Sequence, residues 1–133
     1  MKLFKLFIPL FLMTAFTAGA VNNIVLSDPP VKTICIKHPA AENAGTFFSG
    51  SKVYDFEIYK AGTPAEIDAI IKSLNGANGV ESCVKGQLYG DYQRVTITLK
   101  TNKDKAWFIA AFKKAGLGHI RMNNHDIVAV DKL

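Results

Sequence analysis

The sequence has few of the residues and motifs that usually mark a chemical activity. Its 133 residues include two cysteines, three histidines and one tryptophan. No glycine-rich loop follows an apparent strand, as phosphate binding requires, and no nucleophile lies in a recognisable elbow motif. The sequence also has no internal repeat and no low-complexity tract. We therefore expect a protein that is not an enzyme.

Positive charge is present, but without the arrangement that nucleic-acid binding needs. The formal net charge is +5, from 16 lysines and arginines against 11 acidic residues. These lysines are scattered along the chain instead of forming a basic stripe interleaved with aromatic residues. Binding to nucleic acid requires such a concentrated patch. We expect no nucleic-acid partner and a solvated surface.

Only one long apolar run occurs, and it lies at the N-terminus. Lys2 and Lys5 precede the apolar stretch 6–13, and Ala18-Gly19-Ala20 follows as a small-residue cleavage site. This pattern is typical of a secretory signal peptide, here residues 1–20. The stretch is shorter than the roughly 20 residues that a membrane span needs. We expect an exported protein, periplasmic or secreted, with no membrane span in the mature chain.

The two cysteines, Cys35 and Cys83, leave three alternatives open. An exporting compartment permits a disulfide between them. The sequence does not show whether their backbones approach within bonding range. They could also be two separate buried thiols, or each could contribute to binding a metal.

Residues 21–52 are predicted to be an N-terminal linker with one extra strand. Asp28-Pro29-Pro30 is typical of a linker, and the alternation of β-branched and polar residues over 31–37 predicts a short strand. Residues 40–52 contain small residues and glycines, so we expect a loop that Phe47-Phe48 anchors.

Residues 53–133 are predicted to form one domain with the order strand, helix, strand, strand, helix, strand. The expected strands are 53–60, 80–88, 92–99 and 119–122, and the expected helices are 63–75 and 102–115. A further short extended run is expected over 127–130. This order predicts an α+β fold, a ferredoxin-like βαββαβ sandwich with two helices on one face of an antiparallel sheet. The extra N-terminal strand or loop is added to it. The other sheet face would carry Asp55, Glu57, Arg94, Thr96 and Thr98. It would be either exposed to solvent or covered by the N-terminal strand and Phe47-Phe48.

The first predicted helix has the clearest local signals. Thr63, Pro64 and Glu66 form a capping box with proline at the first helical position. Asn75-Gly76 should end the helix, with the glycine in the left-handed conformation. Both helices carry one apolar stripe at i, i+3, i+4 and i+7. The stripes are Ile67, Ile70, Ile71, Leu74 and Phe108, Ala111, Phe112, Ala115.

Several short pieces in this order carry a resemblance to a known family. They are Ile70 and Leu74, then Gly79-Val80-Glu81-Ser82, Arg94-Val95-Thr96-Ile97 and Lys114-Ala115-Gly116-Leu117. Over residues 53–120 the chain resembles a heavy-metal-associated (HMA) domain, the fold of copper chaperones and of the N-terminal domains of metal-pumping ATPases. The resemblance implies a ferredoxin-like domain related to metal transport.

The family's metal-binding loop, Met-x-Cys-x-x-Cys, has lost its ligands in this chain. A gapless match places its methionine at Ala61 and its two cysteines at Thr63 and Glu66. Hydroxyl and carboxylate oxygens are poor ligands for Cu(I), and the two residues make a poor pair for zinc. The resemblance therefore implies a degenerate metal site, and the same two residues are explained by the capping box.

A second set of metal ligands is conceivable near the C-terminus. His119, Met122 and His125 carry groups that suit copper, and Cys35 and Cys83 are further candidates. In a continuous strand His119 and Met122 would point to opposite faces. Only a turn at Asn123-Asn124 would bring the two histidines together. The alternative is a set of polar residues around a surface hairpin, with Cys83 as a buried core thiol.

Two functions follow from these observations. The first is a non-catalytic binding or interaction module in the cell envelope, without a cofactor, that contacts another envelope protein through an exposed loop or strand edge. The alternative is an unconventional heavy-metal-binding protein in metal transport or homeostasis, with a copper or zinc ion as its ligand.

Overall fold

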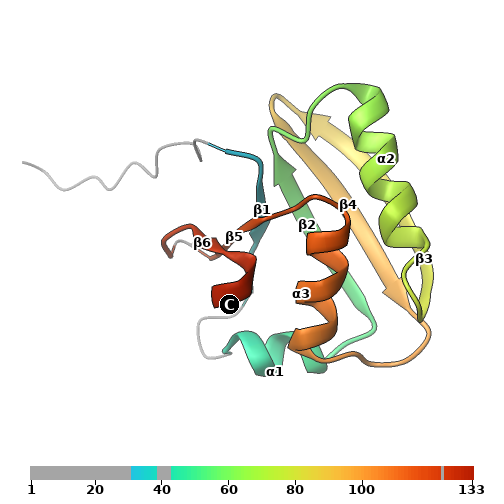
Figure 1. Cartoon of the computed structure of the whole chain (residues 1–133), viewed down its shortest axis with the longest axis vertical. Helices are drawn as coiled ribbons and strands as arrows, with labels where there is room; N and C mark the ends of the chain where they lie inside the picture. The colour runs from blue at the N-terminus through green and yellow to red at the C-terminus, as the bar shows by residue number, and fades with distance from the viewer. Residues whose placement is uncertain (1–30, 39–42, 124) are drawn as a thin grey trace, which may run out of the picture.

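The computed structural model describes residues 31–38, 43–123 and 125–133. The predicted signal peptide, 1–20, and the predicted linker, 21–30, lie outside the described residues. Within the described part the fold is α+β, with a six-stranded sheet and three α-helices (Figure 1). None of the described helices is long and apolar enough to cross a membrane.

The elements follow the predicted order from residue 53 onward. The strands are β1 (Thr33–Ile36), β2 (Val53–Tyr59), β3 (Val80–Tyr89), β4 (Tyr92–Leu99), β5 (His119–Met122) and β6 (Val128–Ala129). The helices are α1 (Ala44–Ser49), α2 (Pro64–Asn75) and α3 (Lys105–Lys114), followed at the C-terminus by a 3-10 turn, η1 (Val130–Lys132).

The N-terminal strand β1 lies inside the sheet. The strand order is β3-β4-β2-β1-β5-β6, with β1 antiparallel to β2 and parallel to β5. The expectation of a wholly antiparallel sheet is therefore wrong, because β1 inserts between β2 and β5 and runs in the direction of β5. Ile34 and Ile36 are almost completely buried on the helix-covered face. This burial of apolar area favours the internal position over an edge.

The capping box of α2 is confirmed. The Thr63 hydroxyl accepts a hydrogen bond from the backbone N–H of Glu66 at 3.3 Å, and the Glu66 carboxylate accepts one from the N–H of Thr63 at 2.6 Å. The apolar stripe faces the sheet, since Ile67, Ile70 and Leu74 are buried.

The predicted left-handed conformation of Gly76 is wrong, although α2 does end at Asn75. Gly76 has φ −77°, and the positive φ occurs at Gly79, with φ +92°. The Asn75 side chain accepts from the Cys83 N–H at 2.6 Å and donates to the Cys83 carbonyl at 2.8 Å. These two hydrogen bonds fix the end of α2 to β3. The chain therefore adopts the left-handed conformation at Gly79, three residues after Gly76.

Helix α3 lies within the predicted range of 102–115, and local signals mark both of its ends. Asp104 is the N-cap of α3, and its side chain accepts a hydrogen bond from the Trp107 N–H at 2.9 Å. Gly116 has φ +80°, and the N–H of the fully buried Leu117 donates to the Phe112 carbonyl at 2.9 Å. The chain after the helix therefore folds back onto it.

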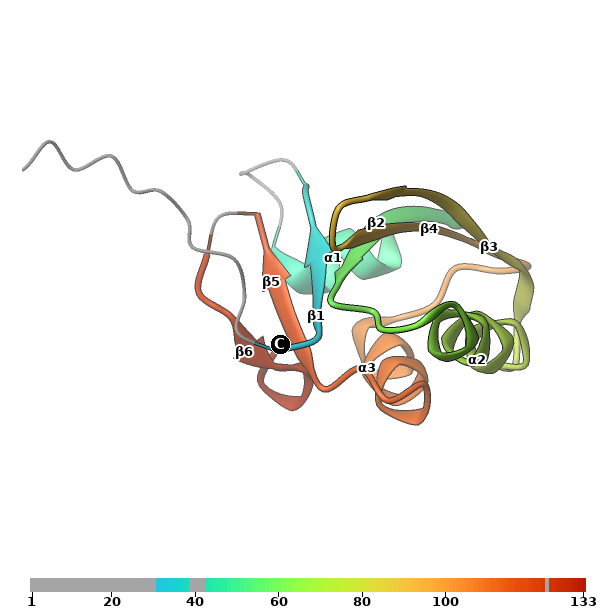
Figure 2. The ribbon, with the colours of Figure 1, turned by 90° about the horizontal axis from the view of Figure 1, so that it is seen from above.

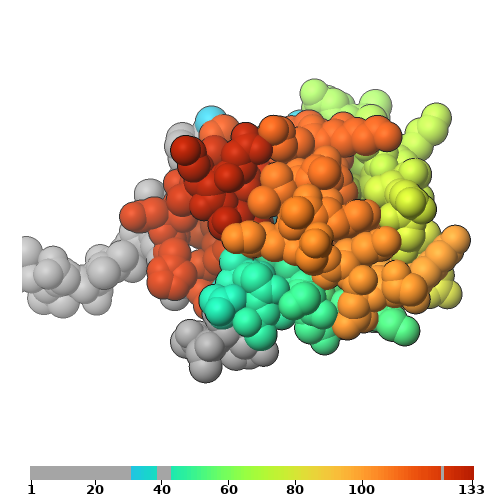
Figure 3. All heavy atoms as spheres, turned by 60° about the horizontal axis from the view of Figure 1, so that its bottom comes forward, coloured from blue at the N-terminus to red at the C-terminus, as the bar shows by residue number. Residues whose placement is uncertain are grey.

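The predicted loop over 40–52 contains a helix, α1. Its N-cap is Asn43, whose side chain accepts from the Thr46 N–H at 2.8 Å. Phe48 is fully buried against Phe108, with ring centroids 4.6 Å apart, so the expected apolar anchor is present. Six residues are too few to show a helical stripe in the sequence, and tertiary contact stabilises the helix. Figure 3 shows α1 beside α3 and the C-terminal residues.

The core lies between the sheet and its helices. Helices α2 and α3 lie side by side on one face of the sheet (Figure 2). Alternate residues of the two central long strands point toward them and are buried. These are Tyr54, Phe56 and Ile58 on β2, and Val95, Ile97 and Leu99 on β4. The intervening residues form the opposite face of the sheet, which we call the open face.

Candidate functional site

The open face carries a row of side chains that crosses four neighbouring strands. Cys35 on β1 is paired in register with Arg121 on β5 and with Glu57 on β2. Glu57 is in turn paired with Arg94 on β4. Because side chains alternate along a strand, these four lie on the same face. We call Arg121, Cys35, Glu57 and Arg94 the charged row.

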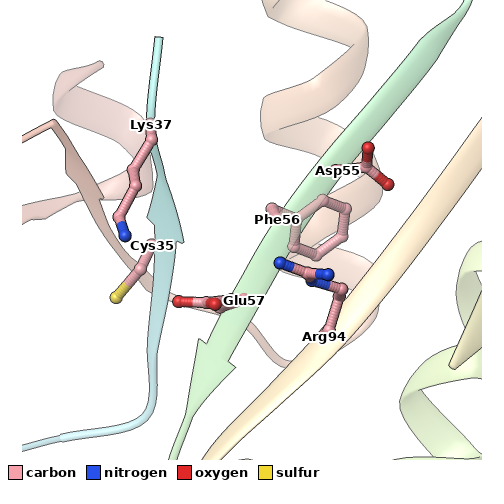
Figure 4. Close-up of a pocket in the computed structure, with 6 residues that line it drawn as sticks. All are labelled: Cys35, Lys37, Asp55, Phe56, Glu57 and Arg94. Atoms are coloured by element: carbon pink, nitrogen blue, oxygen red, sulfur yellow. The ribbon is translucent and has the colours of Figure 1, made fainter. Parts of the chain in front are cut away.

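A groove lies along the charged row. One part has a volume of about 380 Å³ and is lined by residues that include Lys37, Tyr89, Tyr92 and Arg121. A second part of about 190 Å³ includes Asp55 and Arg94. Both parts share Cys35, Lys37 and Glu57, so we treat them as one open-face groove. Figure 4 shows the Glu57 carboxylate directed toward β1 and the Arg94 guanidinium lying beside β2.

The charged groups of the groove are not neutralised by one another. The ion pairs found within the described ranges are Lys85–Asp68 and Lys113–Asp131, and both lie elsewhere. Lys37, Glu57, Arg94 and Arg121 therefore have no opposite charge within ion-pair distance in the part of the chain that the structure describes. A ligand that brings complementary charge would meet three cations, Lys37, Arg94 and Arg121, and two carboxylates, Glu57 and Asp55.

The neighbours of the two arginines are a thiol and an aromatic ring. Arg121 Nη2 donates to Cys35 Sγ at 3.9 Å, and the Arg94 guanidinium lies 5.9 Å from the ring centroid of Tyr89. The Tyr59 and Tyr92 rings also pack against each other on this face, at 4.8 Å between centroids. The groove thus combines cations with aromatic surface.

Cys35 is half-buried within this groove. Burial raises the pKa of the Cys35 thiol, and the positive charge of Arg121 offsets only part of that effect. The thiol is therefore protonated at neutral pH, which makes it a weak nucleophile.

The structure excludes a disulfide between Cys35 and Cys83. The two residues lie on β1 and β3, with β2 and β4 between them, which is three strand spacings or roughly 14 Å. Disulfides need Cα atoms within about 7 Å. Cys83 also points to the opposite face, where burial raises its pKa to about 11. Both thiols are free, and Cys83 is a core residue.

The candidate ligands near the C-terminus are not on one face. His119 is exposed, whereas Met122 is 8% exposed and faces the core beside Ile36. Asn123 has a positive φ of +51°, and the N–H of His125 donates to the Met122 carbonyl at 3.1 Å. Among the described residues no group of three His, Cys, Asp or Glu side chains is arranged to hold a metal ion.

Ala61, Thr63 and Glu66, the positions that the resemblance to HMA domains predicts for the metal loop, have structural roles here. Ala61 is 3% exposed and belongs to the core. Thr63 and Glu66 form the capping box of α2, and the backbone N–H of Thr63 lowers the pKa of the Glu66 carboxyl. In this structure these three positions supply a core contact and a helix cap.

Strand β3 forms one edge of the sheet and exposes apolar side chains. Val84, Leu88 and Tyr89 are 55%, 56% and 47% exposed, and they make up most of the large exposed hydrophobic residues in the described part. The Asn75 side chain occupies both backbone groups of Cys83, so the edge accessible to a partner begins after that residue. Val84 and Tyr89 point to the open face, according to their pairing with Thr96 and Tyr92.

Sequence reasoning identified part of this site. The alternation in the strands placed Glu57 and Arg94 on the face away from the helices, which is confirmed. Arg121 was missed as a neighbour of Cys35, because its proximity depends on the parallel pairing of β1 with β5. Lys37 follows Cys35 by two residues, so strand alternation alone could have placed it on the same face. The alternative that the N-terminal strand covers this face is excluded, since β1 joins the sheet itself.

No protein-family model, no curated protein and no solved structure matches this chain. The resemblance to HMA domains stays a prediction, and any function has to be argued from the site.

Proposed function

We propose that this protein is an exported, non-catalytic binding module of the cell envelope, with an HMA-like, ferredoxin-like domain whose metal site is degenerate. The order β2-α2-β3-β4-α3-β5 supports the fold assignment, because it is the split βαβ order. Without β1, the sheet order would read β3-β4-β2-β5, in which each helix connects two strands separated by one other strand.

The observation that carries the proposal is the exposed edge of β3 next to the open-face groove. Sheet edges accept an added strand through their backbone groups, and alternate side chains supply specificity. Residues 84–89 combine this edge with exposed apolar side chains. A partner strand there would lie beside Tyr89, which also lines the groove.

Photocrosslinking at defined positions tests this proposal. A photoreactive amino acid would replace Val84 or Leu88 in the full chain, expressed in its source cells, and crosslinked envelope proteins would be identified by mass spectrometry. Lys72, exposed on α2, is the matched control position. We expect one protein to be crosslinked at 84 and 88 but not at 72. If equal expression gave the same products from all three positions, the edge would not be a docking site.

The alternative function, unconventional binding of copper or zinc in metal transport or homeostasis, is supported by Cys35, the half-exposed thiol that faces Glu57 across the groove. Native mass spectrometry of the reduced protein with Cu(I) or Zn²⁺ tests it. A single bound ion that is lost in Cys35→Ser and kept in Cys83→Ser would favour this function. No stoichiometric ion in the unsubstituted chain would exclude it.

A further inference from the structure

The charges of the charged row alternate in sign across the sheet. Arg121, Glu57 and Arg94 lie on β5, β2 and β4, in one row. Neighbouring strands are about 4.8 Å apart, which places Glu57 roughly 10 Å and Arg94 roughly 14 Å from Arg121 along the row. None of the three forms an ion pair within the described residues. A complementary ligand therefore needs negative, positive and negative groups over about 14 Å.

An extended polypeptide meets this requirement. It advances about 3.3 Å per residue and places residues i, i+2 and i+4 on one side, so that i and i+4 are about 13 Å apart. Acidic side chains at i and i+4 would reach Arg121 and Arg94, and a basic side chain at i+2 would reach Glu57. Lys37, which follows β1 in the groove, adds positive charge near the Arg121 end.

We propose that the open-face groove binds an extended segment of a partner protein with the pattern acidic-x-basic-x-acidic. This inference rests on the proposed binding function and names the chemistry of the partner. The aromatic surface of Tyr89 and Tyr92 borders the groove and would pack against the residues that flank the segment. Interface aromatic residues commonly take this role.

The same charges disfavour two other ligands. A flat anionic membrane surface would bring lipid phosphates against Glu57 and Asp55, and like charges brought together oppose binding. A single small anion would contact one arginine and leave the other, about 14 Å away, without a partner.

Two synthetic peptides test the pattern on the reduced full mature chain. The probe contains Glu-Ala-Lys-Ala-Glu, and the control reverses every charge as Lys-Ala-Glu-Ala-Lys, both blocked at their termini. In an NMR titration we expect the probe to shift the backbone amides of Cys35, Glu57, Arg94 and Arg121, and the control to shift them at most weakly. Added salt should weaken probe binding, since exposed charges are screened. Equal binding of both peptides would overturn the proposal.

Charge-reversal variants test the named residues. Arg94→Glu combined with Arg121→Glu should weaken probe binding by roughly tenfold or more. Lys72→Glu combined with Lys114→Glu changes the net charge equally on the helices, and it should leave the affinity within about twofold. Adding Glu57→Lys to the arginine pair should reverse the preference toward the control peptide. Unchanged preference in that triple variant, with a well-dispersed spectrum, would contradict the proposal.

Further outcomes separate this inference from the proposed function. Phosphatidylglycerol vesicles that bind the unsubstituted chain but not the double arginine variant would assign the face to a membrane and overturn the peptide proposal. A specific crosslink at position 84 without probe binding would overturn the acidic-x-basic-x-acidic pattern alone. If neither a specific crosslink at position 84 nor binding of the probe peptide were found, the proposed function as a binding module would be overturned as well.

Discussion

The hydrogen bonds between Asn75 and Cys83 offer a sharp test of how the helical layer is fixed to the sheet. Asn75 is the last residue of α2, and its amide both accepts from and donates to the backbone of Cys83 on β3, at 2.6 and 2.8 Å. Asn75→Ala removes both bonds and leaves the partly buried backbone groups of Cys83 without that partner. We expect the variant to fold with lower stability.

The magnitude follows from the two bonds. A hydrogen bond contributes about 1 kcal/mol net, and a buried group left unsatisfied costs roughly 1 to 3 kcal/mol. Water can reach the edge strand, so we place the loss of Asn75→Ala at about 2 kcal/mol. For a domain of this size that corresponds to a fall in Tm of roughly 8 to 16 °C.

Trp107 makes the measurement direct. It is the only tryptophan of the chain, and its indole Nε1 donates to the carbonyl of Asn78, within the turn that follows Asn75. Urea unfolding followed by Trp107 fluorescence should show a lower midpoint with an unchanged m-value. As a control, Asn75→Asp keeps the acceptor for the Cys83 N–H but cannot donate to the carbonyl when ionised. A loss below about 0.5 kcal/mol in Asn75→Ala would refute the reasoning.

Three further predictions concern the core, a helix cap and the thiols. Leu74→Ala should lower the free energy of unfolding in urea by about 2 to 5 kcal/mol, since the Leu74 side chain of α2 is fully buried in the core. A near-neutral value would contradict the core assignment. The Thr63 N–H lowers the pKa of Glu66 in the folded state. The ionised carboxylate therefore stabilises the fold fully above the ordinary pKa of a glutamate, and this stabilisation is lost as the pH falls through the lower pKa of the folded state. In Glu66→Gln, Tm should therefore fall less steeply as the pH is lowered than in the unsubstituted protein. The same dependence of Tm on pH in both proteins would contradict the role of the carboxylate. A thiol reagent should modify the half-exposed Cys35 in the folded protein and Cys83 only after unfolding, and equal rates for both would contradict their placement.

Local chemistry allowed much of the helical layer to be predicted from the sequence. The cap of α2 depends on Thr63 and Glu66, three residues apart, and its buried face on a 3.6-residue period. The end of α3 depends on Gly116 and Leu117, which follow the helix directly. Such signals act within a few residues of one another, so they are readable without the rest of the chain.

The candidate site could be predicted only in part, because pairing between distant segments builds it. Strand alternation placed Glu57 and Arg94 on the open face, but Cys35 and Arg121 are 86 positions apart and meet only through β1 and β5. The short helix α1 could not be predicted for the same reason, since it depends on the contact of Phe48 with Phe108, which is distant in the sequence. The glycine with positive φ after α2 is Gly79 and not the predicted Gly76, because hydrogen bonds from the Asn75 side chain to β3 fix where the chain turns.

The sequence by itself determined the two longer helices, α2 and α3, the outward faces of the long strands and the α+β class, because these follow from periodicity and from capping between near neighbours. Only the tertiary structure decided that β1 enters the sheet between β2 and β5, which burial of Ile34 and Ile36 favours. That one placement separates Cys35 from Cys83 and sets Cys35 beside Arg121. Long-range strand pairing of this kind is selected by the burial of the whole core, which no short stretch of sequence encodes.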